Sequence, residues 1–365
     1  MYRTNTCGEL NKKCVGKEVA LAGWVDSLRI QGKIGFLLLR DRHGVTQCFL
    51  NPELTKEFGH LSKESVVQVK GKVNARPEKQ INKDMATGEV EVEAQEINVL
   101  SVAAELPLDL NIESNEDTRL KYRYLDLRRP EMQKNIELRH KILEFIRDYL
   151  DKLNFVEIST PLLTKSTPEG ARDYIVPSRL HPGKFYALPQ SPQQYKQLLM
   201  VSGFDKYFQI APCFRDEAAR AHRCPGEFYQ LDLEMAFVNR EDILNLIEDL
   251  CSKLVKKILP DKKLTFTKFP RLKYDEVMKK YNTDSPDLRK NKDDPNELAF
   301  CWIIDFPLFT PQTEEDFFHG AGKKWAPSHH MFTMPKEEDL KFLNEKDAGK
   351  VKSYQYDLVL NGFEV

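Results

Sequence analysis

Hydrophobic and polar residues alternate along Lys206–Phe237 in the pattern of two antiparallel strands joined by a charged loop. On the second strand the two faces differ: one carries Tyr229, Leu231, Leu233, Met235 and Phe237, the other Gln230, Asp232 and Glu234. We expect the apolar face to pack on a core. The acidic face should meet a positively charged or hydrogen-bonding group, because carboxylates are rarely buried unpaired. The alternative is a solvated edge hairpin with ordinary surface charge.

The first hundred residues are typical of a small β domain. Short apolar runs separated by turn signals predict strands over Val19–Val25, Gly35–Arg40, Val45–Leu50, Val66–Val73 and Glu89–Val99, with one helix near Pro52–Gly59. Five short strands with one helix indicate an OB barrel over residues 1–105. Such barrels bind single-stranded nucleic acid by stacking bases on aromatic side chains.

Residues 106–130 show little periodicity and predict a linker, which ends in the sequence RYLDLRRP. Its basic residues could contact a nucleic-acid backbone or pair with acids at a domain interface, and both possibilities stay open (Arg119, Arg123, Arg128 and Arg129).

Residues 131–365 predict a second, mixed domain. Apolar positions three and four apart indicate an amphipathic helix over 131–153 that stops at Asn154, followed by a strand at Phe155–Thr160. Ser191 is the expected N-cap of another helix, with Pro192 at its first position. A further helix is expected over Glu241–Ile258.

Composition excludes several classes of protein. The net charge of −1 leaves no overall basic field, so any nucleic-acid contact must use local patches or stacking. The 7 cysteines are scattered and form no C-x-x-C pair, which argues against a disulfide framework or a zinc site and fits the reduced cytoplasm. The sequence has no apolar run of membrane-spanning length and no signal peptide, so we expect no membrane partner.

The words FRDE and, after a short basic loop, EF-x-QLDLEM resemble motif 2 of the class II aminoacyl-tRNA synthetases, in the wording of the bacterial aspartyl type. The resemblance extends, with gaps, over nearly the whole chain. It implies an α+β fold: an OB-fold anticodon-binding barrel (1–105), a hinge (106–130) and a catalytic domain whose antiparallel sheet is flanked by helices (131–365). The helix and strand after residue 131 resemble motif 1, which implies a homodimer.

The resemblance also implies a site for the amino acid L-aspartate. In QSPQ-x-x-K the last residue, Lys196, would meet the substrate's side-chain carboxylate, and Asp232 would hold that lysine in position. A negatively charged ligand in a closed pocket needs a fixed cation, because leaving a buried charge unpaired costs about 3–5 kcal/mol. The whole implied set is Glu169, Gln193, Lys196, Arg215, Gln230, Asp232, His329 and His330.

For ATP, the resemblance makes Arg215 and Glu217 the catalytic residues, because a guanidinium can bond two phosphate or carboxylate oxygens at once. The implied ATP contacts are Arg215, Asp216, Glu217, Cys224 and Glu364, although the loop around Cys224 departs from the family pattern by one extra residue. Asp357 and Glu364 would hold Mg²⁺. Their odd spacing would place them on opposite faces of a straight strand, so a bulge or a turn at Asn361-Gly362 is expected.

In the barrel, the pattern GWV…F…LRDR-x-G…Q resembles the anticodon-binding domain of the same family. Phe36 would stack on an anticodon base, while Arg29, Gln47 and Glu91 would contact base edges or the backbone. The alternative is that Phe36 is a core aromatic and Arg29 an ordinary surface charge.

The expected function is ATP-dependent ligation of aspartate to tRNA-Asp, with tRNA-Asn left open. A short polar stretch, Lys290–Asn296, stands where bacterial-type relatives carry an inserted domain, and the resemblance stops at Val365 without the family's motif 3 region. Two alternatives stay open. One is a sister synthetase for asparagine or lysine, and the other is a catalytically inactive, synthetase-derived tRNA-binding protein.

Overall fold

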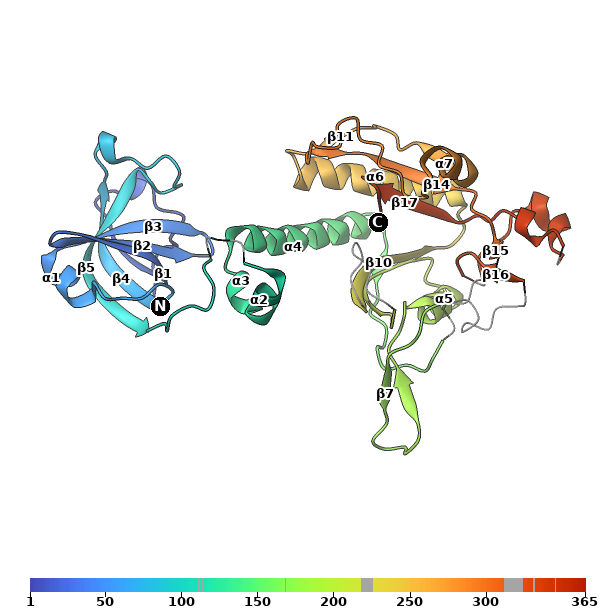
Figure 1. Ribbon diagram of the computed structural model, residues 1–365, viewed down its shortest axis with the longest axis horizontal. Coiled ribbons are helices and arrows are strands. Elements are labelled where there is room, and N and C mark those ends of the chain that lie inside the picture. Colours follow the sequence, from blue (N-terminus) through green and yellow to red (C-terminus); the bar gives the residue numbers. More distant parts are fainter. Residues whose placement is uncertain are drawn as a thin grey trace. The chain divides into compact units, whose positions relative to one another are not determined.

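The computed structural model describes residues 1–110, 112, 114–167, 169–217, 226–311, 324–330, 332–344 and 346–365 (Figure 1). The chain divides into two compact units, Met1–Glu137 and Leu138–Val365. None of the helices in these described ranges is both long enough and apolar enough to span a bilayer.

The first unit contains a closed five-stranded barrel, which confirms the prediction from the sequence. The strands follow the order β1-β2-β3-β5-β4, and one helix follows β3. Their bounds are β1 Glu18–Gln31, β2 Ile34–Asp41, β3 Gly44–Leu50, α1 Pro52–Phe58, β4 Val66–Ala75 and β5 Val90–Ser101, with 3₁₀ turns η1 Lys12–Cys14 and η2 Glu78–Gln80. Asn51 caps α1 by accepting a hydrogen bond from the Leu54 N–H.

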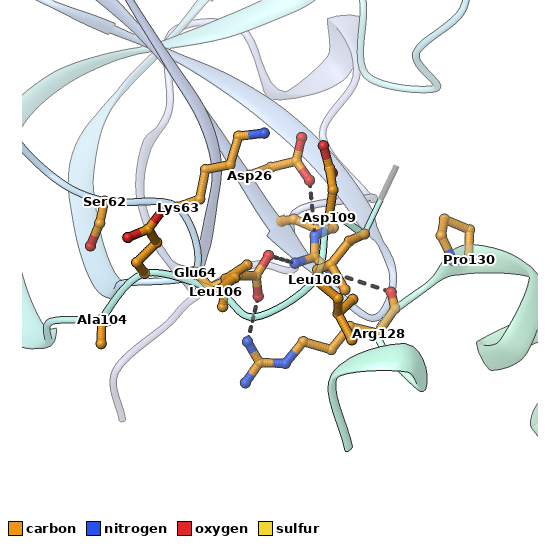
Figure 2. Close-up of a pocket in the computed structure, with 13 residues that line it drawn as sticks. Asp26, Ser62, Lys63, Glu64, Ala104, Leu106, Leu108, Asp109, Arg128 and Pro130 are labelled. Atoms are coloured by element: carbon orange, nitrogen blue, oxygen red, sulfur yellow. Dashed lines mark hydrogen bonds and ion pairs between the residues drawn. The ribbon is translucent and has the colours of Figure 1, made fainter. Parts of the chain in front are cut away.

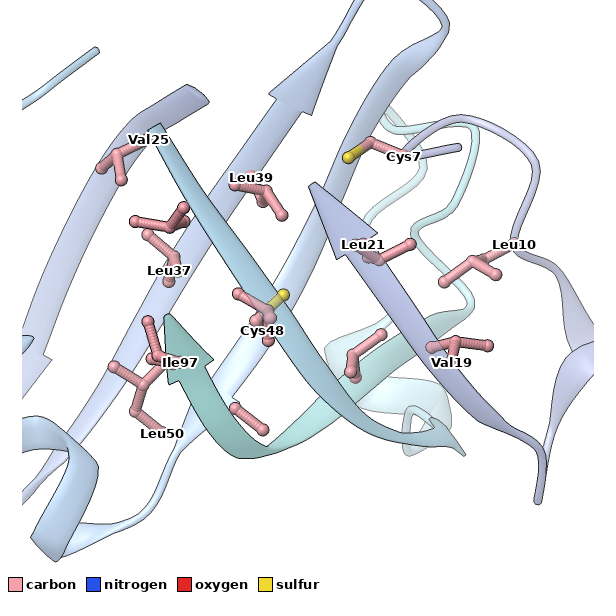
Figure 3. Close-up of a cluster of buried hydrophobic side chains, with 14 of the residues drawn as sticks. Cys7, Leu10, Val19, Leu21, Val25, Leu37, Leu39, Cys48, Leu50 and Ile97 are labelled. Carbon is pink, nitrogen blue, oxygen red and sulfur yellow. The ribbon is translucent and has the colours of Figure 1, made fainter. Parts of the chain in front are cut away.

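Alternate residues of the strands fill the barrel (Figure 3). Leu21, Leu37, Leu39, Cys48 and Leu50 are completely buried there. Burial raises the pKa of the Cys48 thiol to about 12, so this cysteine packs as a small apolar residue. Because the inward positions are apolar, polar and aromatic residues at the alternating positions are left on the outer face.

The expected linker contains two short helices, α2 (Glu116–Lys121) and α3 (Arg123–Asp126), so the prediction of an irregular segment is wrong at these positions. Asp126 is fully buried and forms ion pairs with Arg119, Arg123 and Arg129. Helices this short leave no clear apolar period in the sequence, and a buried charge cluster stabilises them instead. Three of the four linker arginines thus pair with an acid of their own segment, and contact with a nucleic-acid backbone stays a prediction.

The second unit begins within the long helix α4 (Pro130–Asp151), which packs on a three-stranded sheet of order β10-β9-β6. The strands are β6 Val156–Glu157, β9 Lys206–Phe214 and β10 Glu227–Met235. The predicted apolar face of β10 reaches the core through Leu231, Leu233 and Met235. The same expectation is wrong for Tyr229 and Phe237, which are 55% and 99% exposed. Tyr229 lies under the Arg139 guanidinium, and Phe237 follows the end of the strand with a positive φ.

A second sheet in this unit has the order β12-β14-β17-β18, formed by β12 Arg271–Lys273, β14 Phe300–Ile304, β17 Tyr356–Leu360 and β18 Phe363–Glu364. Helix α6 (Arg240–Ile258) covers one face and α7 (Tyr274–Tyr281) the other. The remaining elements are β7 Ile175–Pro177, β8 Phe185–Ala187, α5 Gln193–Val201, β11 Lys263–Leu264, β13 Glu297–Leu298, β15 Phe309–Pro311, β16 Trp325–Pro327, η4 Glu337–Phe342 and η5 Ala348–Lys350.

Candidate active site and nucleic-acid interface

Lys196 lies on α5, which packs against β9 and β10. Its Nζ is 2.7 Å from Asp232 Oδ1 and 3.1 Å from Glu234 Oε1, and its side chain is 13% exposed. Burial alone would lower the pKa of Lys196, but the two neighbouring carboxylates outweigh it and the pKa is raised. The lysine is therefore a fixed cation. The resemblance supplied Asp232 as its partner, whereas Glu234 was not predicted.

Ser191 does not cap α5, so that prediction is wrong. The residue at the cap position is Pro192, with no side-chain hydrogen bond to the helix. The Ser191 hydroxyl instead donates to Glu169 Oε2 (2.6 Å), while the Thr167 hydroxyl donates to Glu169 Oε1 (2.8 Å). The hydrogen bond from the Ser191 hydroxyl to a carboxylate is charge-assisted, whereas a capping bond from a helix N–H to the same hydroxyl would be neutral. Charge-assisted hydrogen bonds are about twice as strong as neutral ones, so the contact with Glu169 is preferred.

Gln190, which the sequence did not single out, fastens the loop that carries Glu169. Its side chain is 1% exposed; it accepts a hydrogen bond from the Ala171 N–H (2.9 Å) and donates to the Ala171 carbonyl (2.8 Å) and to Asp173. Three bonds from one buried amide fix the loop beside α5. Gln193 and Lys196 stand three residues apart on that helix and so share a face.

Arg215 follows the end of β9, and its guanidinium lies 5.0 Å from the centre of the Phe228 ring on β10. Its N–H donates to the Gly226 carbonyl (2.8 Å). Asp216 and Arg172 exchange bonds: the Asp216 N–H donates to the Arg172 carbonyl, and Arg172 Nε donates to the Asp216 carbonyl. The motif 2 strand is thereby joined to the Glu169 loop. Glu217 is exposed, and the predicted contact Cys224 lies outside the described residues.

The rings of His329 and His330 are in contact, with their centres 4.0 Å apart and their planes tilted by 42°, and His330 stacks on Phe332. Burial lowers the pKa of His330 to about 4, with further lowering from His329, Arg215 and Lys196. Burial also lowers the pKa of His329, against the opposing effect of Glu364. Arg215 thus acts electrostatically on both imidazoles and Lys196 on that of His330, although more than a hundred positions of the sequence separate the histidines from either cation.

The neutral imidazole of His330 should make stability depend on pH. In the unfolded chain this histidine binds a proton below its ordinary pKa of 6.5, whereas the folded protein takes it up only near pH 4. The stabilisation is thus fully present above pH 6.5 and is lost as the pH falls toward 4. In urea unfolding, wild type should lose more stability between pH 7.5 and 5 than His330→Gln. Identical pH dependence of the two proteins would contradict this.

Asp357 and Glu364 lie on the β17–β18 hairpin, whose turn is at Asn361-Gly362, as the sequence predicted; both turn residues have positive φ. Val359 pairs with Glu364, so Glu364 shares a face with Val359 and hence with Asp357, two residues earlier. Among the described residues no three possible metal ligands gather at one point. Two carboxylates on one face fit Mg²⁺, which usually takes one or two carboxylates plus phosphate oxygens. 

Gln230, on β10, accepts a hydrogen bond from the Cys213 thiol (3.2 Å) on the neighbouring strand β9. It lies on the same face of β10 as Asp232, two residues further along. Gln230, which was predicted to contact the substrate, therefore lies beside Asp232, the partner of Lys196. Its side-chain carbonyl oxygen already accepts the hydrogen bond from Cys213.

On the barrel, strand register places the predicted anticodon residues on the outer face. Arg29 pairs with Phe36, Phe36 with Phe49, and their neighbours Leu37 and Leu50 point inward. Phe36 is half-buried against the edge of the Phe49 ring, and Arg29 is exposed. Phe36 is therefore outside the barrel core, which removes the alternative of a core aromatic.

Gln47 and Glu91 also lie on this outer face, but they are tied to each other. Gln47 Nε2 donates to Glu91 Oε2 (2.8 Å), and Arg76 Nη2 donates to Gln47 Oε1 (3.0 Å). Gln47 is 4% exposed. Arg76, which follows β4, was missed because an arginine in a polar turn has no distinctive spacing. Arg76 adds a second guanidinium to the outer face of the barrel, where Arg29 is the arginine among the predicted anticodon contacts.

Two family models match the chain. Residues 115–365 match the model described as tRNA synthetases class II (D, K and N). Residues 19–100 match the model described as OB-fold nucleic acid binding domain, which agrees with the closed barrel.

Curated relatives share about half of their residues with this chain. An aspartate–tRNA(Asp/Asn) ligase from Rickettsia bellii is 55% identical, covering 97% of this chain and 60% of the relative. An aspartate–tRNA ligase from Streptomyces coelicolor is 53% identical, covering 92% and 54%. An aspartate–tRNA(Asp/Asn) ligase from Pelagibacter ubique is 54% identical, covering 79% and 49%. The chain thus spans about half to three fifths of the length of these relatives.

Solved structures agree on the fold. The asparaginyl-tRNA synthetase of Pyrococcus horikoshii, complexed with asparaginyl-adenylate, superposes with a TM-score of 0.74 at 25% identity, covering 98% of this chain and 80% of that one. The aspartyl tRNA synthetase of Entamoeba histolytica gives a TM-score of 0.70 at 23% identity, covering 98% and 76%.

Proposed function

We propose that this chain, which belongs to the class II tRNA synthetases of the D, K and N group, ligates aspartate to tRNA. In the first step a carboxylate oxygen of aspartate attacks the α-phosphate of ATP, giving aspartyl-adenylate and pyrophosphate. In the second step the terminal adenosine of tRNA takes the aspartyl group and AMP leaves. Neither step needs a covalent protein nucleophile, so catalysis depends on positioning and on stabilising charge.

The observation that carries the choice of aspartate is the fixed cation at Lys196. Asp232 and Glu234 account for two of its three N–H donors. We assign the third donor to the side-chain carboxylate of the substrate. A neutral amide could not balance the lysine charge in the same way, and a lysine substrate would be repelled. Glu169, held by Ser191 and Thr167, is a candidate partner for the substrate ammonium.

For the nucleotide, we assign Arg215 to the α-phosphate and the reacting carboxylate, with Asp216 and Glu217 beside it. Stacking on Phe228 limits the movement of the guanidinium and leaves its N–H groups for oxygen ligands. Asp357 and Glu364 would hold Mg²⁺, which screens the phosphate charges when bound. The neutral rings of His329 and His330 can accept or donate a hydrogen bond beside the two cations without adding positive charge.

For the nucleic acid, we assign the outer face of the barrel, with Phe36 and Arg29, to the anticodon of tRNA-Asp. Charging of tRNA-Asn is the second candidate, because relatives from Rickettsia and Pelagibacter carry both tRNAs in their names. We also propose a homodimer. Its support is the exposure of Val156 on β6 and of Leu162 and Leu163 after it, at 46%, 40% and 56%.

The test of the proposed function is amino-acid-dependent exchange of pyrophosphate into ATP by the full-length protein. Aspartate should support exchange at least a hundredfold better than asparagine or lysine, and charging should then be measured on tRNA-Asp and tRNA-Asn. Exchange with asparagine would identify a sister synthetase. Binding of tRNA without exchange for any of the three amino acids would identify a catalytically inactive tRNA-binding protein.

Replacing Phe36 with alanine should weaken the use of tRNA without affecting adenylate formation. One stacked base contributes about 1–3 kcal/mol, so kcat/KM for tRNA should fall about 5- to 150-fold. Pyrophosphate exchange should be unchanged. Tyr2→Ala is the matched control, because it removes an exposed aromatic side chain from the same unit. Equal charging by Phe36→Ala and wild type would contradict the stacking role.

A further inference from the structure

A buried ion-pair cluster joins the barrel to the segment before α4 (Figure 2). The Glu64 carboxylate accepts hydrogen bonds from two arginines, Arg40 of β2 and Arg128 of the segment that leads into α4. Arg40 also donates to the Arg128 carbonyl (3.3 Å) and, through Nε, to Asp26 of β1 (3.1 Å). The cluster lies wholly in the first unit and borders a pocket of about 440 Å³.

Glu64 is held firmly at this position. It is 5% exposed, and its backbone has φ +66°, a conformation that costs a non-glycine residue energy and persists only where the surroundings impose it. Its N–H donates to the Val25 carbonyl of β1 (2.7 Å). On the other side of the cluster, the Arg128 guanidinium lies 5.4 Å from the centre of the Trp24 ring. One carboxylate thus fixes Arg128 relative to two strands of the barrel.

Arg128 is followed, after one residue, by Pro130, where α4 begins, and α4 runs past the boundary at Glu137 into the second unit. We propose that Glu64 is a positioning residue that sets the direction in which the chain leaves the barrel. This inference rests on the proposed function. A tRNA bound by its anticodon is a long ligand, and its remote binding energy speeds the reaction only if the far end is aligned with the adenylate.

Removing the Glu64–Arg128 ion pair should therefore lower kcat for charging rather than raise KM for tRNA. In the full-length Glu64→Gln protein the barrel still binds the anticodon, so KM for tRNA should stay within threefold of wild type. The acceptor end is then aligned less often, so kcat for charging should fall at least tenfold. Pyrophosphate exchange, which needs no tRNA, should stay within twofold. Glu57→Gln makes the same chemical change on the exposed face of α1 and should leave all three quantities unchanged.

A second substrate separates alignment from general damage. On a tRNA with a substituted anticodon the aligning contact is already lost, so wild type and Glu64→Gln should charge it equally slowly. Arg128→Gln removes the same ion pair by changing the partner that is partly exposed. It therefore tests the proposal even if the buried substitution, Glu64→Gln, prevents folding. The Glu64→Gln/Arg128→Gln double variant should charge tRNA no more slowly than either single variant, because all three proteins lack the same Glu64–Arg128 ion pair.

A rise in KM at constant kcat, a matching loss of exchange, or multiplicative losses in the double variant would each overturn the positioning role. Normal charging by both single variants would reject this inference alone. Absence of aspartate charging by the wild-type protein would reject the proposed function, and this inference with it.

Discussion

Replacing Lys196 with methionine should abolish most aspartate activation. The substitution removes the only positive charge of the Lys196, Asp232 and Glu234 cluster and leaves two carboxylates facing the substrate carboxylate. Removing one partner of a buried charge pair costs about 3–5 kcal/mol, which corresponds to a fall in kcat/KM for aspartate of roughly 10²- to 10⁴-fold. The measurement is aspartate-dependent pyrophosphate exchange by the full-length protein at saturating ATP.

The loss should be specific to that lysine. Lys256→Met removes an exposed lysine of α6 and should leave exchange unchanged. Because two unbalanced carboxylates also strain the fold, thermal unfolding of Lys196→Met should be compared with that of Lys196→Met/Asp232→Asn. The second protein should recover stability without recovering exchange. If Lys196→Met activates aspartate as well as wild type does, the lysine does not contact the substrate.

Replacing Arg215 with alanine should slow adenylate formation without weakening tRNA binding. Removing one preorganised donor to developing charge typically lowers kcat about 10²- to 10³-fold. Arg215→Lys keeps the charge but loses the planar fork and the contact with Phe228, so its kcat should lie between those of alanine and wild type. Single-turnover formation of aspartyl-adenylate measures this step directly.

The matched control for Arg215 is Arg179→Ala, which removes an exposed arginine from the same unit. It should form adenylate at the wild-type rate. An Arg215→Ala protein with unchanged adenylate formation, or one whose defect is confined to tRNA binding, would contradict the assignment to the α-phosphate.

Much of the fold followed from local patterns. Four of the five barrel strands and α1 lie within two residues of their predicted bounds, because alternating apolar positions and turn residues are properties of short stretches. The first strand, β1, runs on to Gln31, six residues past its predicted end at Val25. The predictions failed where a distant partner decided the outcome. Ser191 reaches the Glu169 carboxylate rather than the helix, and Asp126 collects arginines into helices too short to show a period.

Part of the candidate site also followed from the sequence, through the family resemblance rather than through periodicity. QSPQ-x-x-K and QLDLEM indicated the pair of Lys196 and Asp232, and the structure places their atoms 2.7 Å apart. Glu234 was assigned only to the same strand face. That it shares the lysine, and that Gln190 fastens the Glu169 loop, depend on side-chain positions that no spacing in the sequence specifies.

By itself, the sequence determined the barrel strands and the acidic face of the motif 2 hairpin, since each is encoded by neighbouring residues. The turn at Asn361-Gly362 followed from the family resemblance, which required Asp357 and Glu364 to share one site. Only the tertiary structure decided which charges meet. Glu64 and Arg128 are 64 positions apart, and Gln47 and Glu91 are 44 apart. Contacts of this kind, an ion pair in the first case and a hydrogen bond in the second, form because strand register and helix packing bring the groups within a few ångströms, and no local pattern records that approach.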